Sequence, residues 1–60
     1  MDINRMLHEI WEHDIHWRLG NDADRGIHMY NSKTGVALYA DNVEDVIRKL
    51  WISLFYTGAQ

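Results

Sequence analysis

The chain has 60 residues, enough for one domain, and nine acidic against six basic residues give it a net charge of −3. That charge argues against direct binding to DNA or RNA, because nucleic-acid-binding domains of this size are usually basic. Cysteine is absent, which excludes disulfides and thiolate metal sites, and no apolar run approaches the length of a membrane span. No signal peptide is recognisable, so we expect a cytoplasmic protein without a cofactor.

The first expected element is a helix over residues 2–13, with Asp2 as its N-terminal cap. Apolar residues recur there at the spacing i, i+3, i+4 and i+7, which places them on one helical face. They are Ile3, Met6, Leu7 and Ile10.

Three strands are expected next, at about residues 15–19, 27–31 and 36–40. The segment GNDADRG reads as a loop between the first two strands, and NSKTG reads as a tight turn before the third. Alternation predicts a set of inward-facing apolar side chains. They are Ile15, Trp17, Leu19, Ile27, Met29, Val36, Leu38 and Ala40.

The last expected element is a helix over residues 42–56, with Asp41 and Glu44 as a capping pair and Gly58 as its stop signal. Its surface should carry the i,i+4 ion pairs Glu44–Arg48 and Asp45–Lys49. The expected buried stripe comprises Val43, Val46, Ile47, Leu50 and Leu54.

These elements predict a single α+β domain over residues 1–60, with the order α-β-β-β-α. Its three-stranded antiparallel sheet should carry both helices on one face. The double-stranded RNA-binding domain has the same order, but it meets phosphates with lysines at the start of its last helix. Here that position reads DNVED, so RNA binding of this kind is excluded.

The stretch HEIWEHDIH resembles the zinc-hydrolase signature H-E-x-x-H, but His8 and His13 are five residues apart. Five residues turn a helix by about 500°, so these two side chains point about 140° apart. Glu9 and His13 have usable i,i+4 spacing, which leaves an adventitious two-ligand site as an alternative to a solvated helix face. Neither serine lies in a nucleophile elbow and no phosphate-binding glycine loop is present, so we expect no enzymatic activity.

Acidic residues should gather at one end of the sheet, because the first and third strands of a meander run in the same direction. The expected cluster comprises Asp22, Asp24, Asp41, Glu44 and Asp45. Clustered like charges cost stability, which favours a functional role in binding a basic partner. The alternative is that the last three acids only serve the start of the helix.

Four aromatic side chains lie beside the apolar stripes rather than within them: Trp11, Trp51, Phe55 and Tyr56. Trp and Tyr are favoured in protein interfaces, so these residues are candidates for the surface of a homodimeric adaptor or structural module. A wide core between the two helices is the alternative.

The opening pattern M-D-I-N-x-x-L-x-E-I-x-x-x-D and the run V-I-R-K-L-W-I-S-L-F resemble the small phage anti-CRISPR proteins that inhibit type II-A effector nucleases. The resemblance implies DNA mimicry, in which carboxylates occupy the basic channel that reads a short duplex motif. Asp14 matches an acidic position of that family, whereas two others correspond to Thr34 and Ala37. The implied function is inhibition of a CRISPR effector by protein–protein contact, in the host cytoplasm.

Overall fold

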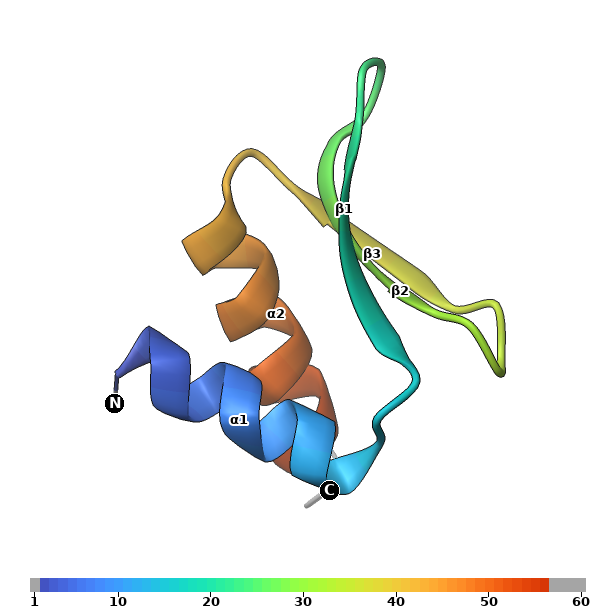
Figure 1. The fold of residues 1–60 in the computed structure, drawn as a ribbon. Coiled ribbons are helices and arrows are strands. Elements are labelled where there is room, and N and C mark those ends of the chain that lie inside the picture. Colours follow the sequence, from blue (N-terminus) through green and yellow to red (C-terminus); the bar gives the residue numbers. More distant parts are fainter. Residues whose placement is uncertain (1, 57–60) are drawn as a thin grey trace.

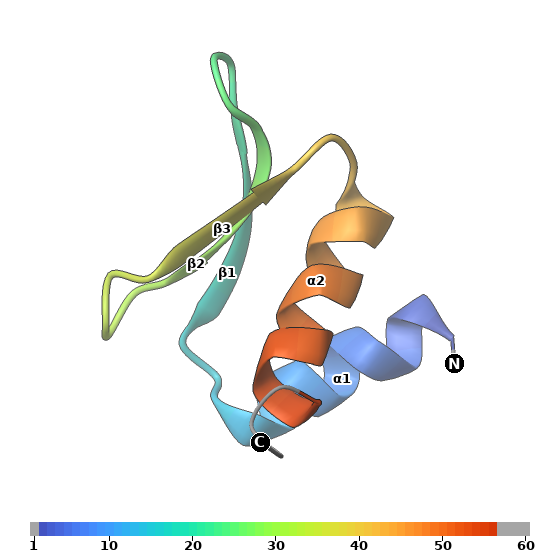
Figure 2. The same ribbon diagram turned by 180° about the vertical axis from the view of Figure 1, so that it is seen from behind.

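A computed structural model describes residues 2–56 of the chain. Its elements are α1 (Ile3–His13), β1 (Trp17–Asp22), β2 (Gly26–Asn31), β3 (Ala37–Ala40) and α2 (Val43–Phe55). The strands form one antiparallel sheet in the order β1-β2-β3, and both helices lie on the same side of it (Figures 1 and 2). The predicted α+β fold is therefore confirmed.

The core lies between α2 and the sheet. Helix α2 packs against β2 and β3, while α1 packs mainly against α2 and leaves β1 largely uncovered. Ile10 of α1, Met29 of β2 and Val46 of α2 are completely buried, so both helices and the sheet contribute to the same apolar cluster. The other buried apolar residues are Met6, Trp17, Ile47 and Leu50.

Helix α1 forms where its periodicity predicts. The side chain of Asp2 accepts a hydrogen bond from the backbone N–H of Asn4, which satisfies one of the free donors at the helix start. Met6 and Ile10 are buried, and Ile3 and Leu7 pack beside the core. The helix ends at His13 because Asp14 adopts an extended backbone conformation.

The first strand differs from the prediction, since it begins at Trp17 rather than at residue 15. Asp14 accepts the backbone N–H of His16, which folds Ile15 into a turn and leaves its side chain 71% exposed. Leu19 is also exposed, at 43%, because no helix covers β1 at its level. The inward orientation predicted for Ile15 is therefore wrong, whereas Leu19 lies on the same sheet face as Trp17 and pairs with Met29 but is not buried.

The predicted loop GNDADRG is mostly strand. Residues 20–22 continue β1, and only residues 23–25 form the turn to β2. Asp22 stabilises this turn by accepting the backbone N–H of Asp24 at 2.9 Å, and Gly26 follows with a φ of 93°, which favours glycine. Pairing of the two strands thus overrides the polar composition that predicted a loop.

Helix α2 begins one residue later than its predicted capping pair. Asn42, not Asp41, is the N-cap: its side chain accepts the backbone N–H of Asp45 and donates to the Asp45 carboxylate. The backbone of Asn42 is extended, with φ −149° and ψ 169°, so the first helical residue is Val43. The predicted stop at Gly58 lies outside the described residues.

Other predictions at the start of α2 are also corrected. Arg48 pairs with Asp45 at 3.6 Å instead of with Glu44, and Lys49 donates to the backbone carbonyl of Tyr39 instead of pairing with Asp45. Val43 is 40% exposed because it lies in the first turn of the helix, at the border of the core. Val36 is 51% exposed because it precedes β3, at the margin of the covered sheet face.

Candidate functional site

The junction between α1 and β1 is organised by Asp14. One carboxylate oxygen accepts the backbone N–H of His16 at 3.0 Å and contacts the His16 ring nitrogen Nδ1 at 2.7 Å. The other oxygen accepts the side-chain amide of the buried Asn31 at 2.9 Å. Asp14, which the sequence marks as a candidate partner-binding residue, therefore uses both oxygens within the chain.

These bonds also fix the charge of Asp14. The backbone N–H of His16, followed by the Asn31 amide and the His16 ring, holds the pKa of Asp14 well below the ordinary value of aspartate. The carboxylate is consequently ionised across the physiological pH range. Its hydrogen bonds indicate a structural role at the point where the helix passes into the strand.

The structure separates the histidines and acids that could have formed a metal site. His8 faces Glu12 at 3.9 Å, whereas the ring of His13 packs against Phe55 with centroids 5.5 Å apart. Glu9 accepts a hydrogen bond from the indole N–H of Trp51 at 2.8 Å and pairs with Arg5 at 3.6 Å. Within residues 2–56, no three His, Cys, Asp or Glu side chains come together in a way that could hold a metal ion.

The predicted acidic residues lie at the end of the sheet that contains the β1–β2 turn. Ile27 pairs with Ala40, so Asp41 leaves β3 beside the base of the hairpin. Figure 1 shows the hairpin tip projecting past the sheet there, while the chain from β3 turns off toward α2. The acidic residues thus lie at one end of the molecule, but they are divided between the β1–β2 turn and the segment that leads into α2.

The acids at this end fall into two groups. Asp22 and Asp45 are engaged locally, the first in the turn and the second at the helix cap and with Arg48. The backbone N–H of Asp24 lowers the pKa of Asp22. Asp24, Asp41 and Glu44 are exposed, and their side-chain carboxylates have no hydrogen bond or ion pair to any other described residue. The guanidinium of Arg25, a neighbouring cation, lies over the ring of Tyr39 at 5.5 Å.

The four candidate interface aromatics do not form one surface. Trp51 contacts Phe55 and Tyr56, each with ring centroids 5.5 Å apart, and this group lies along α2 next to His13. Trp11 points to the other side of α1, where its indole N–H donates to the backbone carbonyl of Trp17 at 3.0 Å. Trp51 is half-buried, whereas Tyr56 is 65% exposed.

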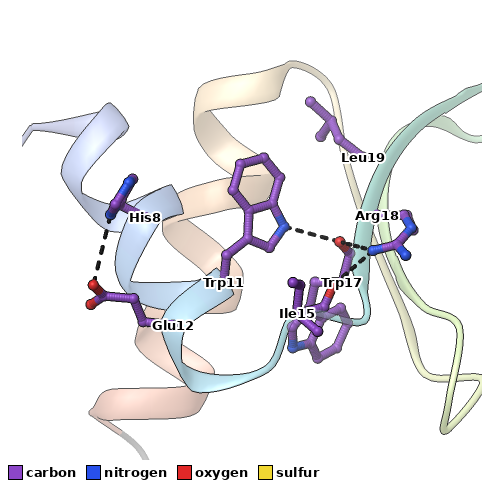
Figure 3. A pocket seen from close by; sticks show the side chains of 7 residues that line it. All are labelled: His8, Trp11, Glu12, Ile15, Trp17, Arg18 and Leu19. Carbon is purple, nitrogen blue, oxygen red and sulfur yellow. Dashed lines mark hydrogen bonds and ion pairs between the residues drawn. The ribbon is translucent and has the colours of Figure 1, made fainter.

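A groove of about 480 Å³ runs between α1 and β1, and sequence reasoning did not predict it (Figure 3). Its apolar wall consists of Trp11, Ile15 and Leu19, which were expected in the core or in an aromatic surface. The complete lining comprises His8, Trp11, Glu12, Ile15, Trp17, Arg18 and Leu19. Only the displacement of β1 away from α1 creates it, and no spacing in the sequence signals that displacement.

Comparison with known proteins gives no relative for this chain. No protein-family model matches it, and neither a curated protein nor a solved structure does. Within the described part of the chain, neither helix is both long and apolar enough to cross a membrane. A functional interpretation therefore depends on the arrangement of its own residues.

Proposed function

We propose that this protein is a small non-enzymatic inhibitor that binds a basic surface of another protein. The observation that carries the proposal is the presence, at one end of the sheet, of three exposed carboxylates that have no partner among residues 2–56: Asp24, Asp41 and Glu44. The resemblance to phage anti-CRISPR proteins supplies the candidate target, a CRISPR effector in the host cytoplasm. The acidic end would enter the channel that normally accepts DNA.

The charge distribution explains why such binding would be favourable. Unpaired carboxylates at one end of a small domain repel one another, and arginines or lysines on a partner would relieve that repulsion. Complementary charge mainly accelerates encounter and selects the partner, so salt should weaken the interaction. Asp22 and Asp45 add negative charge, while their hydrogen bonds hold the turn and the helix start in position.

The test is charge reversal at the three unpartnered positions. The triple variant Asp24→Lys, Asp41→Lys, Glu44→Lys should bind CRISPR effectors at least about tenfold more weakly than the original protein, because like charges would then face each other. Glu12→Lys is the control, since Glu12 is an exposed acid on α1, remote from the hairpin tip. Pull-down and target-cleavage assays against a panel of effectors, at low and high salt, measure both binding and inhibition. A triple variant that binds and inhibits like the original protein refutes the proposal.

A further inference from the structure

One edge of the sheet has free backbone hydrogen-bonding groups. The order β1-β2-β3 places β1 at an edge of the sheet. Just before β1, the carbonyl of His16 accepts the backbone N–H of Ser32 at 3.0 Å, so the backbone groups of His16 point toward the β2 side. Backbone groups alternate in direction along an antiparallel strand, so those of Leu19 and Asn21 point away from β2. An exposed edge of this kind is a template for pairing with another strand.

The available stretch of this edge is short and well defined. At Trp17 the outward carbonyl is occupied by the Trp11 indole at 3.0 Å and by Arg18 at 3.3 Å. Beyond Asp22 the chain enters the hairpin turn. Only Leu19 and Asn21 therefore offer both an outward N–H and an outward C=O in regular strand geometry.

We propose that two copies of this chain form a homodimer by antiparallel pairing of their β1 strands, with Gly20 opposite Gly20. In this register Leu19 of each copy pairs with Asn21 of the other, so the free N–H and C=O groups of both residues form hydrogen bonds in each copy. A shift of the register by two residues would pair Asn21 with Trp17, whose outward carbonyl is already occupied, or Leu19 with Ala23 in the turn. The result would be a continuous six-stranded sheet with all helices on one side.

Charge complementarity supports a second copy as the occupant. In the proposed register Arg18 lies directly opposite Asp22 of the second copy, and the two-fold axis repeats this pair. The guanidinium of Arg18 lies at the edge of β1, on the side that the second copy would approach. Arg18 uses one guanidinium nitrogen, Nη1, for its bonds to the carbonyls of Ile15 and Trp17. Asp22 uses Oδ1 for the turn, and its lowered pKa keeps it ionised. Opposite charges that face each other across strands stabilise the pairing.

The groove beside β1 is consistent with the same arrangement. Trp11 is 41%, Leu19 43% and Ile15 71% exposed, an apolar surface that is unfavourable to leave in water. The turn of the second copy would run over this groove and present the small side chain of Ala23. At position 20, glycine leaves room for the ring of His28 on the neighbouring strand, because a Cβ there would lie 2.6 Å from its Nε2 atom.

The experiment uses paired charge reversal, measured by sedimentation velocity over a dilution series without any target protein. The original chain should form dimers as its concentration rises toward the millimolar range. Arg18→Asp alone and Asp22→Arg alone should each dimerise at least about tenfold more weakly, because like charges then face each other. An equimolar mixture of the two variants should restore dimers, since each copy then supplies the complement of the other. Lys33→Asp, which changes the net charge as much as Arg18→Asp but lies in the β2–β3 turn, is the control and should dimerise normally.

Three results would overturn the proposal. They are an original chain that stays monomeric at millimolar concentration, dimers unaffected by Arg18→Asp, and a mixture that dimerises no better than its folded components.

Circular dichroism confirms that each variant is folded. If Asp22→Arg does not fold, Asn21→Pro replaces it, because proline removes the outward N–H without removing a bond to β2. Asn21→Pro should be monomeric, and a normal dimer of this variant also refutes the pairing. Target binding plays no part here, so failure of the inhibitor proposal leaves this result unaffected.

Discussion

Replacing the buried polar residue Asn31 by alanine should destabilise the domain strongly. Asn31 is only 1% exposed to solvent. Its side-chain oxygen accepts the backbone N–H groups of Lys33 and Thr34, each at 2.9 Å. Its amide donates to Asp14 at 2.9 Å. One side chain therefore connects the β2–β3 turn to the junction between α1 and β1.

The magnitude follows from these bonds. The two bonds to backbone N–H groups contribute about 1 kcal/mol each, so their loss alone should lower the free energy of unfolding by about 2 kcal/mol. A domain of 60 residues has a total stability of about 3–9 kcal/mol. The midpoint of thermal unfolding should accordingly fall by about 8–16 °C, since about 4–8 °C corresponds to 1 kcal/mol at this size.

Thermal and urea unfolding followed by circular dichroism measure this effect. The matched control is Asn21→Ala, because the side chain of Asn21 is exposed and makes no hydrogen bond to other described residues. Its effect should stay within about 0.5 kcal/mol. If the two alanine variants unfold at the same temperature, the structural role assigned to Asn31 is wrong.

Two further predictions concern acid stability and the hairpin turns. The folded pKa of Asp14 lies below its unfolded value, so its ionised form stabilises the fold above about pH 4 and this contribution is lost as the pH falls further. The difference in unfolding free energy between the original chain and Asp14→Asn should therefore shrink from neutral pH to about pH 2, and a constant difference in urea titrations would contradict this. Gly26→Ala should destabilise more than Gly35→Ala: both have positive φ, which costs about 1–2 kcal/mol, but only at Gly26 would the new Cβ meet a backbone atom, the carbonyl oxygen of Ala40 at 2.8 Å. Equal melting temperatures for the two glycine variants would show that steric contact is unimportant there.

The sequence by itself was informative about elements that depend on local periodicity. The apolar spacing of α1 predicted the buried Met6 and Ile10, and the stripe of α2 predicted Val46, Ile47 and Leu50. Asp2 was correctly identified as a cap because capping involves a backbone N–H only two residues away. The number and order of the strands also followed from the alternating pattern and the turn residues.

The candidate site was less predictable because its geometry depends on residues far apart in the chain. The bond between Asn31 and Asp14 spans 17 residues and that between Trp51 and Glu9 spans 42. The first assigns Asp14 to the fold, and the second directs Trp51 toward α1, away from Trp11. No local pattern distinguishes such residues from surface acids or interface aromatics.

The sequence thus determined that two amphipathic helices and a three-stranded sheet would form, since hydrogen bonding within elements and the burial of periodic apolar faces are set locally. Only the tertiary structure decided where β1 begins, which residue caps α2, and that α1 rests on α2 rather than on β1. Those outcomes depend on how the layers pack against one another. They leave the edge of β1 and the groove beside it open, and these are the features that support the proposed homodimer.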